Sequence, residues 1–126
     1  MTKFENKFEE VYEEFVELID ELNAKIINEG ATEMDILATQ RATFVLNLAE
    51  MHINDMISVE TLSVGLRDNR QWYAQVPPFL ERARPEEFEK TATDLFPKFE
   101  LIIDNLIDEL DYEPDPFEEL MRALGQ

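Results

Sequence analysis

Apolar residues at the start of the chain recur with the period of an α-helix, and this feature constrains the fold most. Between residues 4 and 22 they are spaced alternately four and three apart, which places them on one helical face. The face is wider than the seam of a two-stranded coiled coil, so it is typical of a helix packed into a globular core. We therefore predict a helix from about Phe4 to Asn28, ended by Gly30. Its apolar positions are Phe4, Phe8, Val11, Phe15, Leu18 and Leu22, flanked by Tyr12, Ile19 and Ile26.

A second helix is predicted from Thr32 to about Ile57. Thr32 followed by Asp35 resembles an N-cap with an acid at the third position of the helix. We expect this helix to be the central element of the core, through its apolar positions Met34, Leu37, Phe44, Val45, Leu48, Met51 and Met56. Its polar side is nearly uncharged, so either other helices cover that side, which is the interpretation we prefer, or it is a face through which the protein forms a homodimer. Its polar positions are Gln40, Thr43, Asn47, Glu50 and Asn54.

The remaining helices are predicted from caps and prolines. A shorter helix over 58–70 is capped by Ser58, and the paired prolines within 71–85 predict a break in the helical pattern. A helix can restart at Pro85, and another begins at about 94–96 with Pro97 in its first turn. The last is predicted over 115–125, with Asp115 as cap and Gly125 as stop. Because no segment has a sustained period of two, the predicted fold class is all-α: a single domain over 1–126, with five or six helices in a bundle-like arrangement.

Composition limits the class of protein. The chain has 126 residues and a net charge of −18, yet 44% of its residues are hydrophobic and nine are Phe, so it can bury enough apolar surface to fold. It has no cysteine, which excludes disulfides, thiolate metal sites and a cysteine nucleophile. The N-terminal residues lack the apolar run of a signal peptide, and no stretch is long enough to span a bilayer. We expect a cytoplasmic protein without a membrane partner.

The negative charge is concentrated at the two ends of the chain. Residues 1–29 carry nine acids and three bases, and residues 86–126 carry thirteen acids and three bases. The middle, residues 30–85, has seven acids and five bases, and all five bases are Arg. The excess charge therefore belongs to particular predicted helices.

Two rows of acids repeat the same helical spacing. They are Glu9, Glu13, Glu17 and Asp20 in the first helix, and Glu100, Asp104, Asp108 and Asp111 near the C-terminus. Each row spans about 16 Å at 1.5 Å per residue. Like charges four residues apart destabilise a helix by about 0.2–0.5 kcal/mol per pair, so mixed Lys and Glu would stabilise these helices better. The rows are either a solvated acidic face or a surface that meets a basic partner.

The partner interpretation rests on a likeness to nucleic acid. A row of about 16 Å matches the length of about five phosphates on one DNA strand. In general character, though not in any motif, the chain is similar to the acidic helical DNA mimics that phages deploy against restriction or CRISPR enzymes. The leading hypothesis is therefore a non-catalytic inhibitor from a phage or mobile element. It would block a basic, nucleic-acid-binding protein through the eight residues of the two rows.

Direct binding of nucleic acid by the chain is not expected. The arginines Arg67, Arg70, Arg82 and Arg84 lie near Trp72 and Tyr73, but this patch is small within a protein of charge −18. We predict that these arginines pair with the protein's own carboxylates and that Trp72 anchors the core. An alternative to the inhibitor is an assembly chaperone or adaptor that binds its partner through an apolar groove.

Metal chemistry is a third alternative, and the spacings disfavour it. The acids of 111–115 alternate like a calcium loop, but Pro116 and Arg122 stand where that loop needs Gly and Glu. The single histidine, His52, lacks the Glu three residues earlier that a di-iron bundle uses. Glu-x-x-Glu pairs in the first helix could serve a metal-dependent all-α hydrolase, but the central helix lacks the second motif. We predict no enzyme activity, cofactor or metal.

Overall fold

The computed structural model describes residues 2–30, 32–110, 112, 120–121 and 123–125. Over these residues the protein has five α-helices and no strand, which confirms the predicted all-α, bundle-like fold. The helices are α1 (Lys3–Glu29), α2 (Glu33–Ile53), α3 (Val59–Ala83), α4 (Pro85–Lys90) and α5 (Phe96–Asp108).

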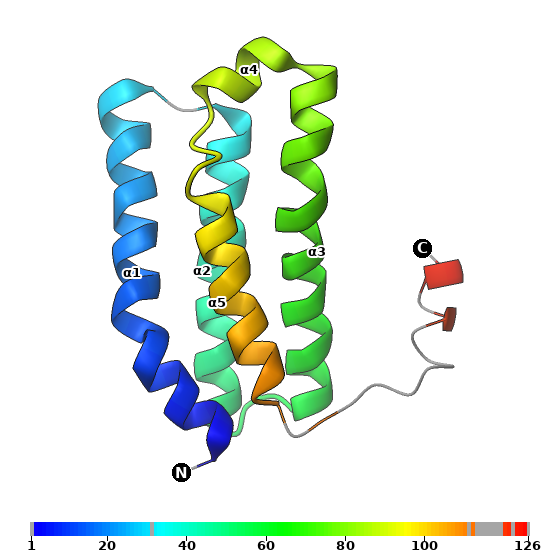
Figure 1. The fold of residues 1–126 in the computed structure, drawn as a ribbon. Helices are drawn as coiled ribbons and strands as arrows, with labels where there is room; N and C mark the ends of the chain where they lie inside the picture. The colour runs from blue at the N-terminus through cyan, green and yellow to red at the C-terminus, as the bar shows by residue number, and fades with distance from the viewer. Residues whose placement is uncertain (1, 31, 111, 113–119, 122, 126) are drawn as a thin grey trace.

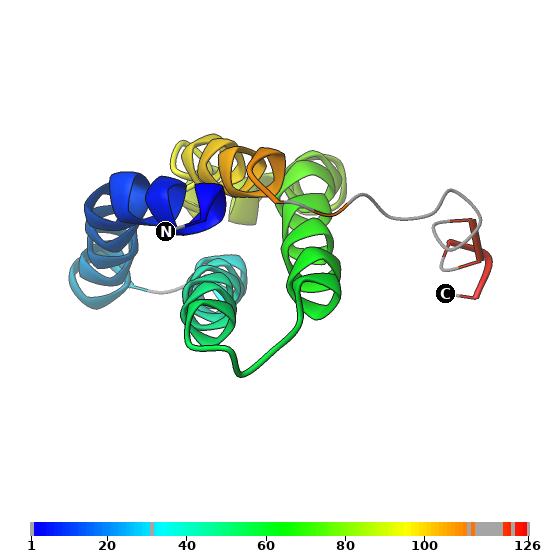
Figure 2. The same cartoon turned by 90° about the horizontal axis from the view of Figure 1, so that it is seen from below.

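The four long helices surround one core. Figure 1 shows α5 in front, between α1 and α3, and the short α4 crossing the top between α3 and α5. Seen from below, α2 lies on the opposite side of the core from α5 (Figure 2). Each of α1, α3 and α5 contacts α2, and α5 also contacts α1 and α3.

The first helix follows its sequence pattern. Thr2 accepts a hydrogen bond from the Glu5 amide as N-cap, and Gly30 has the positive φ of 89° predicted for the residue after the helix. The predicted apolar face is buried, and the ring of Phe15 packs edge-on against that of Phe99 in α5 at 5.8 Å between centroids. Only Tyr12, a flanking position, remains 40% exposed.

The predicted core face of α2 needs correction. Thr32 caps the helix as expected, but Phe44 is 51% exposed and Met56, beyond the helix end at Ile53, is 68% exposed. The predicted positions Val45 and Leu48 are buried, but the helix also buries three alanines that the prediction did not include. Its buried apolar residues are Ala38, Ala42, Val45, Leu48 and Ala49.

The predicted break at 71–85 is wrong, because α3 continues through Pro77 and Pro78 to Ala83. Each proline removes a backbone donor and costs about 3 kcal/mol inside a helix. The cost is offset by burial on both sides of the pair, since Tyr73 and Leu80 are almost fully enclosed. Tyr73 packs against the rings of Phe96 and Phe99.

Gly65, which lies inside the helix predicted over 58–70, has a packing role within α3. A Cβ at this position would collide with Cδ1 of Leu48, a buried residue of α2. The glycine therefore lets α2 and α3 approach each other here, which compensates for its low helix propensity.

The last two described helices begin where expected. Pro85 opens α4, and α5 begins at Phe96 with Pro97 in its first turn. The helix predicted over 115–125 lies mostly outside the described residues. Leu120, Met121, Ala123 and Leu124 are helical, and the Gly125 amide donates to the Met121 carbonyl at 2.9 Å.

Candidate partner-binding surface

The acidic row of α1 is fully presented to solvent. Glu9, Glu13, Glu17 and Asp20 are all exposed on the side of the helix opposite its buried residues. Within the part of the chain that the structure describes, no Lys or Arg nitrogen lies within 4 Å of these four carboxylates. Their mutual repulsion is therefore not relieved by ion pairs inside the protein.

A second line of acids lies beside this row on the same helix, and the sequence analysis missed it. Glu10, Glu14 and Glu21 are also exposed, and only Glu10 has a described ion pair, with Lys7 at 3.3 Å. The signal was present in the doubled acids at 9–10, 13–14 and 20–21. We call the seven exposed residues the α1 acidic face: Glu9, Glu10, Glu13, Glu14, Glu17, Asp20 and Glu21.

The row on α5 is in a different environment. Glu100 is partly buried, and Asp104 forms an ion pair with Arg70 of α3 at 3.1 Å. Asp108 is exposed, and the predicted fourth member, Asp111, lies outside the described residues. Of the three described members of this row, Asp104 is thus bound to α3 through Arg70.

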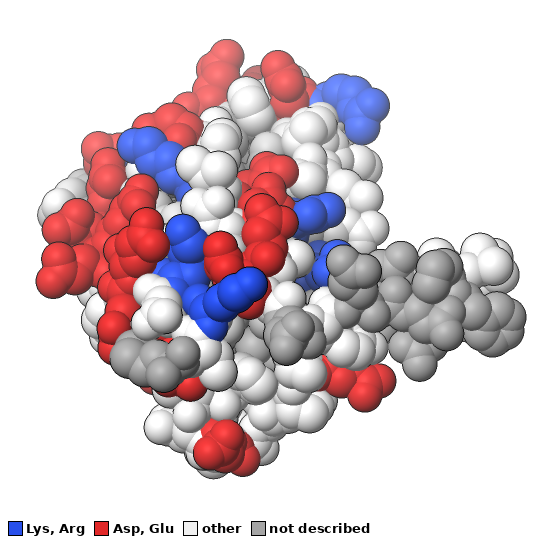
Figure 3. Space-filling view, turned by 60° about the horizontal axis from the view of Figure 1, so that its bottom comes forward, with Lys and Arg blue, Asp and Glu red and all other residues white. Residues whose placement is uncertain are grey.

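The two rows do not form one continuous face. Because Asp104 reaches Arg70, the α5 row lies on the α3 side of α5, whereas α1 packs on the other side of α5. Figure 3 shows acidic side chains gathered over α1 and a separate acidic group nearer the middle, with basic side chains between them. The α1 acidic face is therefore the candidate surface that remains intact.

A different surface lies between α2 and α3. A groove of about 970 Å³ is lined by three arginines, by apolar side chains and by Ala123 of the C-terminal segment. We call it the arginine groove; the lining residues used below are Arg41, Val64, Arg67, Arg70, Trp72 and Ala123.

The predicted internal pairing of arginines is confirmed for two of the four residues. Arg70 pairs with Asp104, and Arg84 pairs with Glu87 at 3.3 Å. Arg67 instead donates to the Ser63 hydroxyl. Among the described residues, neither Arg67 nor Arg82 has a carboxylate within 4 Å.

Arg41 and Trp72 form the centre of the arginine groove. The Arg41 guanidinium pairs with Asp68 at 3.0 Å and lies 5.7 Å from the Trp72 ring centroid, within cation–π range. Trp72 is partly buried and packs against the core, as predicted, and it also lines the groove. Below it, Tyr73 donates a hydrogen bond to the Ala38 carbonyl, and burial raises the pKa of its hydroxyl, with the charge of Arg41 acting in the opposite direction.

The polar side of α2 is not covered by other described helices, so that expectation is wrong. Four of its five predicted polar residues are exposed, and Glu50 is partly buried. Phe44 is exposed on the same outer side. The surfaces of α2 and α3 are thus nearly uncharged or arginine-lined, in contrast to α1.

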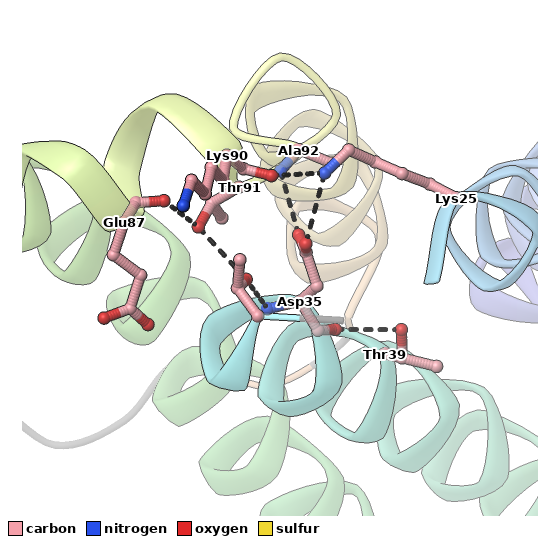
Figure 4. Close-up of polar contacts among 8 residues, drawn as sticks. Lys25, Asp35, Thr39, Glu87, Lys90, Thr91 and Ala92 are labelled. Atoms are coloured by element: carbon pink, nitrogen blue, oxygen red, sulfur yellow. Dashed lines mark hydrogen bonds and ion pairs between the residues drawn. The ribbon is translucent and has the colours of Figure 1, made fainter. Parts of the chain in front are cut away.

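One fully buried carboxylate belongs to a polar cluster at the opposite end of the bundle from the N-terminus. Asp35 of α2 accepts a hydrogen bond from the Ala92 amide at 2.9 Å and pairs with Lys25 of α1 at 3.3 Å (Figure 4). Lys25 also donates to the carbonyl of Lys90. This Asp35 cluster joins α1, α2 and the link between α4 and α5.

The Asp35 cluster is a structural connection. Thr91 links its hydroxyl to Thr32 and donates to the Glu87 carbonyl at 2.8 Å, as Figure 4 shows in part. No described side-chain nitrogen or oxygen that is buried lacks a hydrogen-bond partner. The polar atoms of the cluster are therefore occupied by one another.

Three further observations complete the description of the surface. The described residues contain no group of three or more His, Cys, Asp or Glu side chains placed to hold a metal ion. None of the helices in the described ranges has both the length and the apolar character needed to cross a membrane. Comparison with protein-family models, curated proteins and solved structures found no match in any of the three.

Proposed function

We propose that this protein is a non-catalytic binding protein whose α1 acidic face engages a basic, nucleic-acid-binding protein and blocks it. The observation that carries the proposal is the exposure of seven carboxylates on one helix, six of which have no ion pair among the described residues. Such a surface repels itself, and binding of a basic partner would relieve that repulsion.

The charge density of the α1 acidic face supports a partner that normally binds nucleic acid. Seven carboxylates between residues 9 and 21 fall within about 18 Å of helix axis, or one charge per about 2.6 Å. Duplex DNA has one charge per about 1.7 Å with both strands counted, and one per about 3.4 Å along one strand. The density on α1 lies between these two values, so a groove that binds a phosphate backbone is a suitable partner site. Inhibition by nucleic-acid mimicry, as in a protein of a phage or mobile element, is the form we favour.

A binding experiment with a matched control tests this proposal. The parent protein, Glu13→Lys with Glu17→Lys, and Glu86→Lys with Glu89→Lys are each immobilised and exposed to extracts of the host cell, with and without phage infection. Both double variants change the net charge equally, and Glu86 and Glu89 are exposed on α4, away from α1.

We expect a basic protein to be retained by the parent and the α4 variant, and lost by the α1 variant. Duplex DNA should displace it from the parent. Equal retention by all three proteins would mean that net charge, or another surface, is responsible. Retention that DNA does not affect would contradict mimicry.

The adaptor alternative has one specific observation in its favour, the groove between α2 and α3 with Val64 and Trp72 in its lining. A partner held there through apolar contacts should respond little to salt and should ignore the α1 variant. The same experiment therefore separates the two functions.

A further inference from the structure

The arginine groove is chemically unlike the rest of this acidic molecule. Arg41, Arg67 and Arg70 line it with a single acidic residue, Asp68, which already pairs with Arg41. Arg67 has no described carboxylate within 4 Å. The groove thus offers a guanidinium with free donors next to the partly buried ring of Trp72, a combination suited to an acidic segment that also carries apolar side chains.

The C-terminal segment of the chain has this composition. Leu120, Met121 and Leu124 are helical, share the i, i+1, i+4 spacing of one helical side, and are 54%, 53% and 74% exposed. The sequence from 108 to 119, which leads to them, contains seven acids. Three large apolar side chains exposed together form a surface that favours burial.

The segment can reach the arginine groove. Ten Cα-to-Cα steps lead from Leu110 to Leu120, enough to span up to about 33 Å. The groove extends along α3 from Val64 to Val76, about 18 Å. Figure 1 shows α5 ending near the start of α3, with the C-terminal residues on the α3 side. Ala123 already lies in the lining of the groove.

We propose that the C-terminal segment docks into the arginine groove of its own molecule, with Leu120, Met121 and Leu124 packed near Val64 and Trp72. Docking within the molecule is favoured over docking of a second copy, because the linked segment has a high local concentration and two molecules of charge −18 repel each other. The docked segment would cover the arginines of the groove, so the charge that remains exposed on the protein would be mainly acidic. This proposal is independent of the function of the α1 acidic face.

Trp72 is the only tryptophan in the chain, so its fluorescence reports on the arginine groove. The test variant is Leu120→Glu with Leu124→Glu. The control is Ile27→Glu with Leu101→Glu, which replaces two apolar residues that are 80% and 61% exposed on α1 and α5. Both variants add the same charge, and circular dichroism should show unchanged helix content in each.

We expect a red shift of the Trp72 emission and a larger acrylamide quenching constant in the test variant, with the control equal to the parent. Unchanged emission and quenching in the test variant would overturn the proposal. The parent is also measured over a range of concentrations, with its mass followed by light scattering. Protection of Trp72 that is independent of concentration at a monomer mass of 14.8 kDa supports docking within the molecule, and protection that disappears on dilution would overturn it in favour of a second copy.

Discussion

The outer side of α1 and the outer sides of α2 and α3 are all exposed to solvent, but they differ in charge: α1 is strongly acidic, whereas acids and arginines nearly balance on α2 and α3. The α1 acidic face has seven exposed carboxylates, and six of them have no described cation within 4 Å. On α2 and α3, exposed positions are mostly uncharged, and arginines pair with Asp68 and Asp104. Solubility would be served by acids distributed over both surfaces. This concentration of charge on α1 is the reason for proposing that α1 contacts a basic partner.

The largest expected loss of stability from a single substitution is at the Asp35 cluster, which joins α1 to α2. Asp35→Ala removes the acceptor of the Ala92 amide and the partner of Lys25. Because it leaves the buried Ala92 amide without an acceptor and the largely buried Lys25 ammonium without its counter-charge, we expect the free energy of unfolding to fall by about 3 kcal/mol. Urea denaturation measures this change.

Glu33→Ala is the control for Asp35→Ala. Glu33 lies in the same first turn of α2 but is exposed, so its loss should cost only about 0.5 kcal/mol through the helix dipole. Equal effects of the two substitutions would mean that the Asp35 cluster contributes no more than a charge at a helix end.

A smaller loss of stability is expected from substitution of Tyr73, which lies next to Trp72 in α3. Tyr73→Phe removes the hydrogen bond to the Ala38 carbonyl and should lower the free energy of unfolding by about 1 kcal/mol at neutral pH. Burial raises the pKa of Tyr73 in the folded protein above the ordinary value of about 10. The unfolded chain therefore loses this proton first, so the stabilisation is complete below about pH 10 and is lost as the pH rises further.

The pH dependence distinguishes Tyr73 from other groups. Above about pH 10 the parent should lose stability more steeply than Tyr73→Phe, and their difference should shrink or reverse. Parallel curves from neutral to alkaline pH would contradict the assigned environment of the hydroxyl. Urea denaturation at a series of pH values provides the curves.

The ion pair between α3 and α5 should contribute little stability. Arg70 and Asp104 have side chains that are 46% and 38% exposed, so solvent screens the pair and Arg70→Ala should cost about 0.5 kcal/mol. A double-mutant cycle with Asp104→Ala measures the coupling. A coupling near zero would place Asp104 with the unpaired acids of α1 and weaken the contrast between the two surfaces.

The smallest expected effect has the opposite sign. Glu13→Lys with Glu17→Lys should leave the fold unchanged and raise the free energy of unfolding by a few tenths of a kcal/mol, because it relieves like-charge repulsion along α1. Thermal denaturation at low salt checks this, and added salt should reduce the gain. A clear loss of stability would show that the two glutamates stabilise the fold.

The sequence predicted those elements that depend on local signals. The apolar period of α1 and the early Pro97 of α5 are contained within each segment, so the buried face of α1 and the start of α5 could be predicted. The continuation of α3 could not, because proline rules are local whereas Tyr73 is buried against Phe96 and Phe99 of α5, which are distant in the sequence. The core side of α2 was missed because Ala38, Ala42 and Ala49 carry less apolar signal than Phe44.

The candidate site was predictable in part for a similar reason. The acids of α1 lie on one helix, so their spacing predicts a shared face. Whether the α5 row joins them depends on how α5 is rotated against α3, which the ion pair of Asp104 with Arg70 reveals. The Asp35 cluster had no sequence signal, because Asp35 and Ala92 are 57 positions apart.

The salt dependence of partner binding tests the central claim most directly. The dissociation constant of the retained basic protein is measured from about 50 to 200 mM salt for the parent and for Glu13→Lys with Glu17→Lys. If the α1 acidic face replaces a phosphate backbone, the parent should weaken steeply with salt, and the variant should bind less tightly and with a shallower dependence. Equal affinities and equal slopes would contradict the account and leave the α1 acids as a solvated surface.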